Sequence, residues 1–197
     1  MQKIVNIRPN ITYQLKITLT DVNPPIWRRF TVNPEIKFPD FHKVLQTIMG
    51  WTNTHLHQFR FNDLIYGYDE EELDDDIIDY RNIKLNKLIK HEKEKIIYDY
   101  DFGDGWEHAI ILEKIIDNKL NQPPSPTCID GERSCPPEDC GGPYGYEELL
   151  TALNNPKHED HEEMLDWVGD EFNSEKYDIE YVNKMLKMKN FGCISFT

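Results

Sequence analysis

Residues 98–108, which read YDYDFGDGWEH, constrain the fold of this chain more than any other segment. Residue types that favour strands precede the segment from residue 95 and follow it to residue 116. Between them, Gly103-Asp104-Gly105 is typical of a tight turn, because glycine adopts positive φ freely and aspartate hydrogen-bonds the backbone beside it. The pattern predicts a β-hairpin with strands over residues 95–101 and 106–116.

A second hairpin is predicted near the start of the chain. Apolar residues alternate with polar ones over residues 13–19, which is typical of a half-buried strand. Two prolines follow Asn23 and favour a turn, and residues 26–32 then read as a second strand. One or two short strands are expected within residues 56–66, while residues 83–89 fit either a strand or a short helix.

Helical patterns occur after the first hairpin and in the last third of the chain. Asp40 can cap a helix whose apolar face recurs every three or four residues and which ends at Gly50. Residues 146–153 carry a similar face, Asn155-Pro156 can begin a second C-terminal helix, and Ser174 can begin a third. We therefore expect an α+β fold: a single compact domain in which an antiparallel or mixed sheet, built from the two hairpins, packs with the early helix and the helical last third.

Two segments are expected to form loops. Residues 69–79 hold eight of the 36 acidic residues, and such a run is most simply a solvated loop or an insertion. Residues 118–143 are rich in proline and contain three cysteines, and a loop of this length is usually functional, braced by metal or disordered. We expect one domain over residues 1–197, with its core within residues 10–187.

The charge of the chain argues against broad contact with nucleic acid. The formal net charge is −14, of which the acidic run carries eight charges. Such a protein gains little from neutralising phosphates, so only a small basic patch, at residues 27–29 or 84–95, stays open. The N-terminus does not resemble a signal peptide, and no apolar run approaches the roughly 20 residues that span a membrane. A cytoplasmic protein without membrane contact is expected.

The order of several short motifs resembles that of one protein family. The motifs are PIWRRF at 25–30, MGW at 49–51, HLHQF at 55–59, the hairpin motif at 98–108, CPPEDCGG at 135–142, GY at 145–146, HEEMLDW at 161–167 and Asn183. The set is similar to the plasmid Orf-three-like family named from the pRiA plasmid type.

The resemblance implies a compact α+β domain of bacteria or archaea, often encoded beside mobile elements, whose biochemical role is unsettled. Relatives also carry a resolvase-like label, TnpR, as passenger proteins of insertion elements. That label does not fit these residues, because a serine recombinase needs a nucleophilic serine among arginines and a DNA-binding tail. The serines of this chain lack such surroundings, and its last residues form no basic arm.

Three cysteines of the proline-rich segment are candidate zinc ligands. Cys128, Cys135 and Cys140 are separated by six and four residues, and thiols in a reducing compartment favour metal ligation over disulfides. His108, at the end of the hairpin motif, is the candidate fourth ligand. Since the spacing does not repeat C-x-x-C, three small half-buried thiols in a proline-braced loop are the alternative. Zinc is the one cofactor that the sequence indicates.

A polar pocket is predicted between residues 98–108 and 128–142. Its candidate residues are His55, His57, Asp101, Asp104, Trp106, His108, Glu138 and Asp139. Trp106 and His108 share one face of a strand, and neighbouring prolines and glycines would hold Glu138 and Asp139 in place. Simpler roles compete: turn formation for Asp104, structural hydrogen bonds for the histidines of the HLHQF motif, and helix capping for the two carboxylates.

Two functions fit these residues. The first is a binding or accessory module associated with plasmids or mobile elements, whose partner is an unidentified protein or a small polar ligand. The second is a metal-dependent hydrolase with His55, His57, Asp101 and His108 as ligands and Glu138 as general base. A third reading, an acidic mimic of DNA, rests only on residues 69–79.

Overall fold

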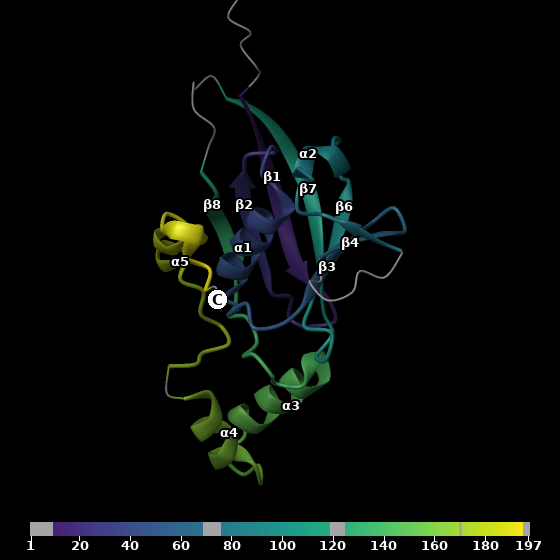
Figure 1. Ribbon diagram of the computed structural model, residues 1–197. Helices are drawn as coiled ribbons and strands as arrows, with labels where there is room; N and C mark the ends of the chain where they lie inside the picture. The colour runs from purple at the N-terminus through teal and green to yellow at the C-terminus, as the bar shows by residue number, and fades with distance from the viewer. Residues whose placement is uncertain (1–9, 69–75, 119–124, 170, 195–197) are drawn as a thin grey trace, which may run out of the picture.

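Within the residues that the structure describes, eight strands form one mixed β-sheet (Figure 1). The structure, a computed structural model, describes residues 10–68, 76–118, 125–169 and 171–194. The strands are β1 (Asn10–Leu19), β2 (Trp27–Val32), β3 (His57–Phe61), β4 (Leu64–Gly67), β5 (Ile77–Asp79), β6 (Lys95–Tyr100), β7 (Trp106–Asn118) and β8 (Thr127–Glu132). Their order across the sheet is β5-β4-β3-β6-β7-β1-β2-β8, and only β4 and β5 run parallel.

Both predicted hairpins are confirmed, and together they form the centre of the sheet. β1 pairs with β2, and β6 pairs with β7 in a register that places Tyr98 opposite His108. β1 also pairs with β7, which joins the two hairpins edge to edge. Alternate residues of β1, beginning with Tyr13 and Leu15, are buried, as expected for a strand with one face toward the core. The predicted α+β fold class is confirmed.

Helix α1 (Phe38–Met49) packs its apolar face into the core. Phe38, Phe41 and Leu45 recur at helical spacing and are fully buried. The helix begins before Asp40, because proline is favoured in a first turn, and the carboxylate of Asp40 binds Lys43 at 3.0 Å instead of capping the helix. Gly50 ends α1 with φ 103°, as predicted, and the chain continues into residues 51–56.

Strand β8 lies inside residues 118–143, which were expected to form a loop. It pairs with the outer edge of β2, with Trp27 opposite Glu132. The strand has a weak sequence pattern because Cys128 alone is buried along it. Gly131 is needed at its end, since a Cβ there would collide with the side chains of Tyr177 and Arg28. The expectation of a continuous loop is therefore wrong, and residues 133–141 form a loop between β8 and the next helix.

The acidic segment also contains regular structure. Its last residues form β5, which pairs with β4, whereas residues 69–75 lie outside the described residues. β5 could not be distinguished from its surroundings in the sequence because it is short and borders the acidic run. The ambiguous residues 83–89 contain helix α2 (Leu85–Leu88), whose two leucines are buried.

The last third of the chain is helical, as predicted, but two of its helices begin later than expected. After α3 (Gly142–Asn154), helix α4 (His161–Val168) begins well beyond Pro156, because the Asn155 side chain accepts a hydrogen bond from the Lys157 N–H and forms a local turn. Helix α5 (Ile179–Met185) is capped by Asp178 rather than by a residue near position 174. A short 3₁₀ helix, Lys189–Gly192, follows.

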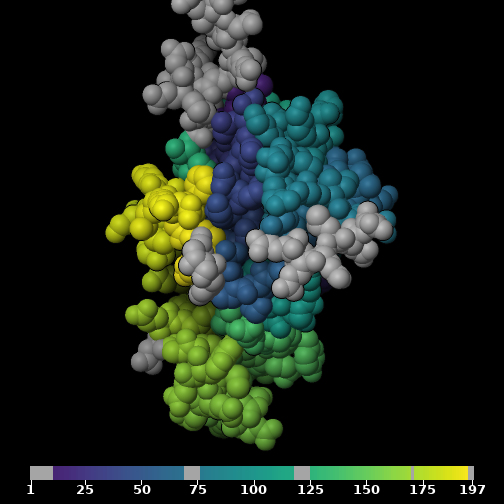
Figure 2. Space-filling view, viewed as in Figure 1, coloured from purple at the N-terminus to yellow at the C-terminus, as the bar shows by residue number. Residues whose placement is uncertain are grey.

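Helices α3 and α4 pack on each other at one end of the sheet, whereas α5 lies against β8 and α1 (Figure 1). The space-filling view shows the α3–α4 pair, in green, as the lower end of the molecule (Figure 2). Because α3 follows residues 133–141 directly, this loop lies where the helical pair joins the sheet. In the described part of the chain, no helix combines the length and apolar character needed to cross a membrane.

Candidate functional site

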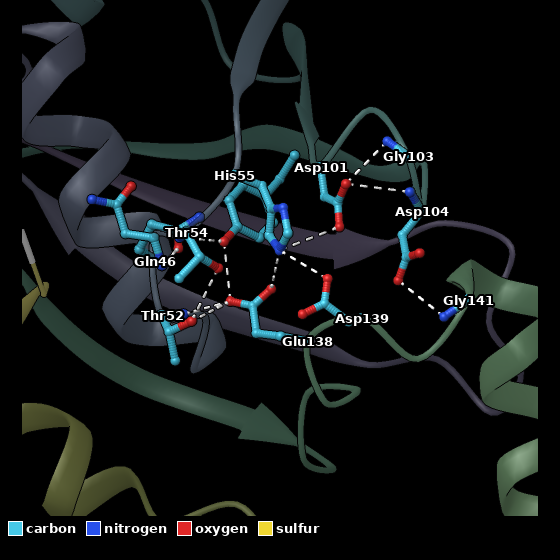
Figure 3. Close-up of polar contacts among 12 residues, drawn as sticks. Gln46, Thr52, Thr54, His55, Asp101, Gly103, Asp104, Glu138, Asp139 and Gly141 are labelled. Carbon is cyan, nitrogen blue, oxygen red and sulfur yellow. Dashed lines mark hydrogen bonds and ion pairs between the residues drawn. The ribbon is translucent and has the colours of Figure 1, made fainter. Parts of the chain in front are cut away.

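His55 is the centre of a cluster of carboxylates at the end of the sheet (Figure 3). Its Nε2 atom lies 3.3 Å from Asp139 Oδ1, 3.6 Å from Asp101 Oδ2 and 3.8 Å from Glu138 Oε2. His55 belongs to the segment between α1 and β3. Asn53 anchors this segment, since its N–H donates to Gln46 Oε1 at 2.9 Å and its side-chain oxygen lies 2.7 Å from His42 Nε2.

Asp101 reaches the cluster because the hairpin turn begins at this residue. Its backbone φ is 56°, a left-handed conformation that aspartate tolerates better than most side chains. Its Oδ1 accepts hydrogen bonds from the N–H groups of Gly103 (3.0 Å) and Asp104 (3.3 Å). Its own N–H donates to the Leu56 carbonyl at 2.9 Å. The side chain is therefore fixed, and Oδ2 faces His55 from a residue that is only 6% exposed.

Glu138 is held by one of its two carboxylate oxygens. Oε1 accepts hydrogen bonds from the Thr52 N–H at 2.6 Å, the Thr52 hydroxyl at 2.9 Å and the Tyr100 hydroxyl at 3.0 Å. The Tyr100 oxygen in turn accepts from the Thr54 N–H at 3.1 Å, and burial raises the pKa of this phenol above its ordinary value. Oε2 is buried and has no hydrogen-bond partner, although it points toward His55.

Asp139 comes from the same loop as Glu138 but lies at the surface. Its side chain is 74% exposed, and its φ of 57° turns the chain sharply between the prolines and the glycines. The loop is fastened to the hairpin turn by the Gly141 N–H, which donates to Asp104 Oδ2 at 3.1 Å. Gly142 allows the closest approach, because a Cβ there would collide with the Asp104 carbonyl oxygen. Asp104 therefore joins the two segments and does not face His55.

The arrangement has the chemistry of a cation site. Among the described residues, His55, Asp101 and Asp139 are the one group of three His, Cys, Asp or Glu side chains whose ligand atoms all lie within 4.8 Å of one another. Imidazole nitrogen and carboxylate oxygen are common ligands of divalent metals. The Oε2 atom of Glu138 lies beside this triad without belonging to it. Three carboxylates around one imidazole repel one another unless a positive charge lies between them.

The structure corrects the expectation that Trp106 and His108 line this pocket. Both do lie on one face of β7, but that face is the core, and neither side chain is exposed. The His108 Nδ1–H donates to the Tyr98 carbonyl at 3.1 Å, and Nε2 accepts from the Trp51 indole N–H at 3.3 Å. Burial lowers the pKa of His108 to about 4, so the ring is neutral at neutral pH. With both nitrogens engaged, His108 is not available as a metal ligand.

His57 is also absent from the cluster. It begins β3, where its ring stacks on His42 with 3.4 Å between the ring centroids and an interplanar angle of 2°. Its Nε2 lies 2.8 Å from the Tyr80 hydroxyl. Burial holds the pKa of His57 well below its ordinary value, and the neighbouring His42 adds to the effect. The two histidines of the HLHQF motif therefore have different roles. His57 lies in β3 and packs in the core, whereas His55 precedes the strand and faces the carboxylates.

The cysteines do not gather with His108 as the zinc prediction requires. No group of three potential metal ligands in the described residues includes a cysteine. Cys128 lies in β8, where its sulfur is 3.0 Å from the Tyr177 hydroxyl. Burial raises the pKa of the Cys135 thiol well above its ordinary value and that of Cys140 to about 12, so both thiols are protonated at neutral pH in this structure. The expected ligand set Cys128, Cys135, Cys140 and His108 is therefore not supported.

Sequence reasoning missed Thr52 and Tyr100, which orient Glu138. Tyr100 lies in the predicted strand over residues 95–101, where its alternation with Asp99 and Asp101 places it on the inner face near the hairpin turn. Thr52 follows the end of α1 and carries no pattern of its own. Its N–H is free to donate because the helix has already ended at Gly50. Both contacts depend on how the loop folds back, which local patterns do not reveal.

Comparison with known proteins finds similar proteins whose descriptions name no activity. Residues 11–181 match the family model described as plasmid pRiA4b ORF-3-like protein. The chain is 40% identical over 175 residues to the uncharacterised protein y4hQ of Sinorhizobium fredii, an alignment covering 88% of this chain and 89% of that protein. A crystal structure of a protein of unknown function from Methanosarcina mazei Go1 is similar at a TM-score of 0.79 and 33% identity, over 88% of this chain and 98% of that chain.

Proposed function

This chain belongs to the plasmid pRiA4b ORF-3-like family, and we propose that it is a binding module that holds a divalent metal ion with His55, Asp101 and Asp139. The three ligand atoms are gathered without any thiol. Two of the ligands come from segments joined by the hydrogen bond between the Asp101 N–H and the Leu56 carbonyl, and the third comes from the loop before α3. A metal ion would therefore join the sheet to the base of the α3–α4 pair.

The observation that carries this proposal is a pair of buried atoms without hydrogen-bond partners. His55 Nε2 and Glu138 Oε2 are both inaccessible and make no hydrogen bond, although they lie 3.8 Å apart, within the distance of an ion pair. Leaving a buried polar atom unpaired costs about 1–3 kcal/mol, and more when the group is charged. A cation bound to His55 Nε2 would satisfy that atom and reduce the repulsion among the acids, and a water molecule on the same cation would be placed to donate to Glu138 Oε2.

The ligand types favour a transition metal over magnesium or calcium. Magnesium and calcium prefer oxygen ligands alone, whereas an imidazole is well suited to zinc, and zinc also accepts carboxylates. Three protein ligands leave a coordination position for a water molecule or a bound partner. Zinc is accordingly the metal to test first, now at His55 rather than at the cysteines.

The test is zinc binding measured by isothermal titration calorimetry and metal analysis on protein without a histidine tag. We expect one zinc ion per chain, with affinity reduced about tenfold or more in Asp101→Asn. The asparagine oxygen can still accept the bonds from Gly103 and Asp104, so the turn is preserved. Asp104→Asn is the matched control, because Asp104 faces Gly141, and Cys135→Ser tests the former ligand set. Two results would refute the proposal. In the first, Cys135→Ser alone loses zinc; in the second, neither the wild type nor any variant binds zinc.

A second candidate, a metal-dependent hydrolase, is favoured by the position of Glu138. Its free oxygen lies beside the metal-ligand triad but outside it, as a general base for a water molecule would. In this function the water oxygen bonds to a substrate carbonyl carbon while Glu138 accepts a proton from the water. That proton then passes to the leaving nitrogen as the carbon–nitrogen bond breaks. The ligands His57 and His108 of the original hypothesis are replaced by Asp139.

Glu138→Gln separates the two candidates. The glutamine oxygen can keep the bonds from Thr52 and Tyr100, so the loop should stay in place. A hydrolase would keep its metal in this variant and lose turnover of amide substrates by about 100-fold or more. A binding module would show no turnover in the wild type either. The broader proposed role, an accessory protein associated with plasmids, draws on the family name, whereas its proposed place in the cytoplasm draws on the sequence alone.

A further inference from the structure

We propose that a hollow between the β1–β2 turn and helix α3 binds a guanidinium group carried on a short apolar chain. The hollow has a volume of about 510 Å³, which lies within the range of small-ligand sites. It is lined by residues 21–23 of the turn, by one side of α3 and by Asn155. It shares no residue with the cluster around His55, so this inference does not depend on the metal-binding proposal.

The charge of the lining favours a cation. The described residues that line the hollow include the carboxylates of Asp21 and Glu147 but no lysine, arginine or histidine. Neither carboxylate forms an ion pair in the described part of the chain. Arg133 reaches the same turn by donating to the Pro24 carbonyl, but it is paired with Glu175 at 2.7 Å. Two unpaired carboxylates in one concave site attract a positively charged ligand.

The polar lining is also rich in hydrogen-bond acceptors. Besides the carboxylates, it includes the amide side chains of Asn23 and Asn154 and the hydroxyl of Thr151, none of which bonds to another described residue. A guanidinium group carries a planar set of N–H donors and no acceptor. It can therefore donate two parallel hydrogen bonds to a carboxylate while its remaining N–H groups reach amide oxygens. An ammonium group, which is a compact point charge, lacks this planar fork.

Apolar side chains line the hollow beside these acceptors. They are Val22 from the turn and Pro143 and Leu150 from α3. A guanidinium group is more weakly hydrated than an ammonium group, so it gives up less hydration on entering such a mixed surface. The methylene groups that carry it would bury apolar area against the same side chains. Acceptors, negative charge and apolar surface together fit an alkylguanidinium better than an inorganic cation.

Four small probes test this ligand class in titrations that follow the amide chemical shifts by NMR. Butylguanidinium should bind about tenfold more tightly than butylurea, its neutral analogue of the same shape, because two exposed ion pairs are together worth about that factor. Methylguanidinium and butylammonium should both bind more weakly than butylguanidinium. The shift changes should concentrate in residues 21–23 and 143–155. A blocked arginine, N-acetylarginine N-methylamide, distinguishes the source of the group: tighter binding than butylguanidinium indicates a protein side chain, and weaker binding a free small molecule.

Charge-removing variants locate the contact. Asp21→Asn and Glu147→Gln should each reduce the affinity for butylguanidinium about threefold. Asparagine tolerates the φ of 58° at position 21, so the turn is kept. Glu148→Gln is the matched control, because it removes the same charge from the next position of α3, outside the lining, and should leave the affinity unchanged.

Several results would overturn the inference. They are equal affinities for butylguanidinium and butylurea, tightest binding of butylammonium, equal losses in Glu147→Gln and Glu148→Gln, and shift changes outside the hollow. The absence of binding at millimolar butylguanidinium would overturn it as well. Each of these results would leave the metal-binding proposal standing, since zinc binding is measured separately at His55.

Discussion

Acidification should destabilise this protein through His108, whose ring is neutral in the folded state. The imidazole is fully buried, and its Nδ1–H donates to the Tyr98 carbonyl while Nε2 accepts from the Trp51 indole N–H. A second proton could bind only at Nε2, where it would face the indole hydrogen. Both the loss of hydration and this clash of donors oppose the charged form.

The size of the effect follows from the lowered pKa. Burial, the largest cause, lowers the pKa of His108 to about 4 from the ordinary 6.5. Between these two values the unfolded chain binds a proton and the folded protein does not, so stability falls as the pH falls. One pKa unit corresponds to about 1.4 kcal/mol, and the whole interval therefore costs about 3 kcal/mol. The contribution of His108 is fully present above pH 6.5 and is lost as the pH approaches 4.

Urea unfolding at several pH values from 7 to 4, on the wild type and His108→Gln, measures this contribution. Glutamine can donate to the Tyr98 carbonyl and accept from Trp51, but it does not titrate. We expect the variant to be less stable at pH 7 and the difference between the two proteins to shrink by about 3 kcal/mol by pH 4. His42, whose pKa burial also lowers to about 4, contributes equally in both proteins. Parallel stability curves would refute the assignment of a neutral, buried His108.

Three further predictions concern the site and the domain. Tyr100→Phe removes one donor to Glu138 Oε1 and should lower stability by about 1 kcal/mol in urea unfolding and weaken zinc binding less than Asp101→Asn does. Gly105→Ala should lower the free energy of unfolding by about 1 kcal/mol, and Gly142→Ala should lower it by more. Both glycines have φ 70°, but only a Cβ at Gly142 would collide with Asp104. Equal losses in the two variants would contradict the close approach of Gly142 to Asp104. A single domain over the core residues should unfold in one transition, with circular dichroism and tryptophan fluorescence giving the same midpoint.

The central elements of the fold could be predicted because their signals are local. Alternation over β1 and the glycine turn after β6 follow from contacts between residues near in sequence. β8 escaped prediction because it is an edge strand with one buried side chain, and its position depends on the neighbouring β2. The start of α4 was misplaced because Asn155, which is suited to a helix cap, forms a turn instead.

The candidate site was only partly predictable, since strand alternation shows that residues share a face but not which way the face points. Trp106 and His108 were grouped correctly with each other and wrongly with the pocket, because their face is the core. Asp101 left that pattern by adopting a left-handed φ at the start of the turn, which moved its carboxylate to the end of the sheet. Local rules place residues on faces, whereas the pairing of strands and the packing of α1 decide which face is buried.

The cluster of His55, Asp101, Glu138 and Asp139 differs from the cysteines in how its side-chain atoms are engaged. Each carboxylate of Asp101 and Glu138 has one oxygen fixed by donors from its own surroundings, which leaves the other oxygen directed at His55. The thiols show the opposite arrangement, because burial favours their protonated form and Cys128 is hydrogen-bonded within the β8 region. A metal ligand needs a lone pair that no proton or other partner occupies, and this is why we propose His55 and its carboxylates as the metal site rather than the cysteine segment that the sequence made prominent.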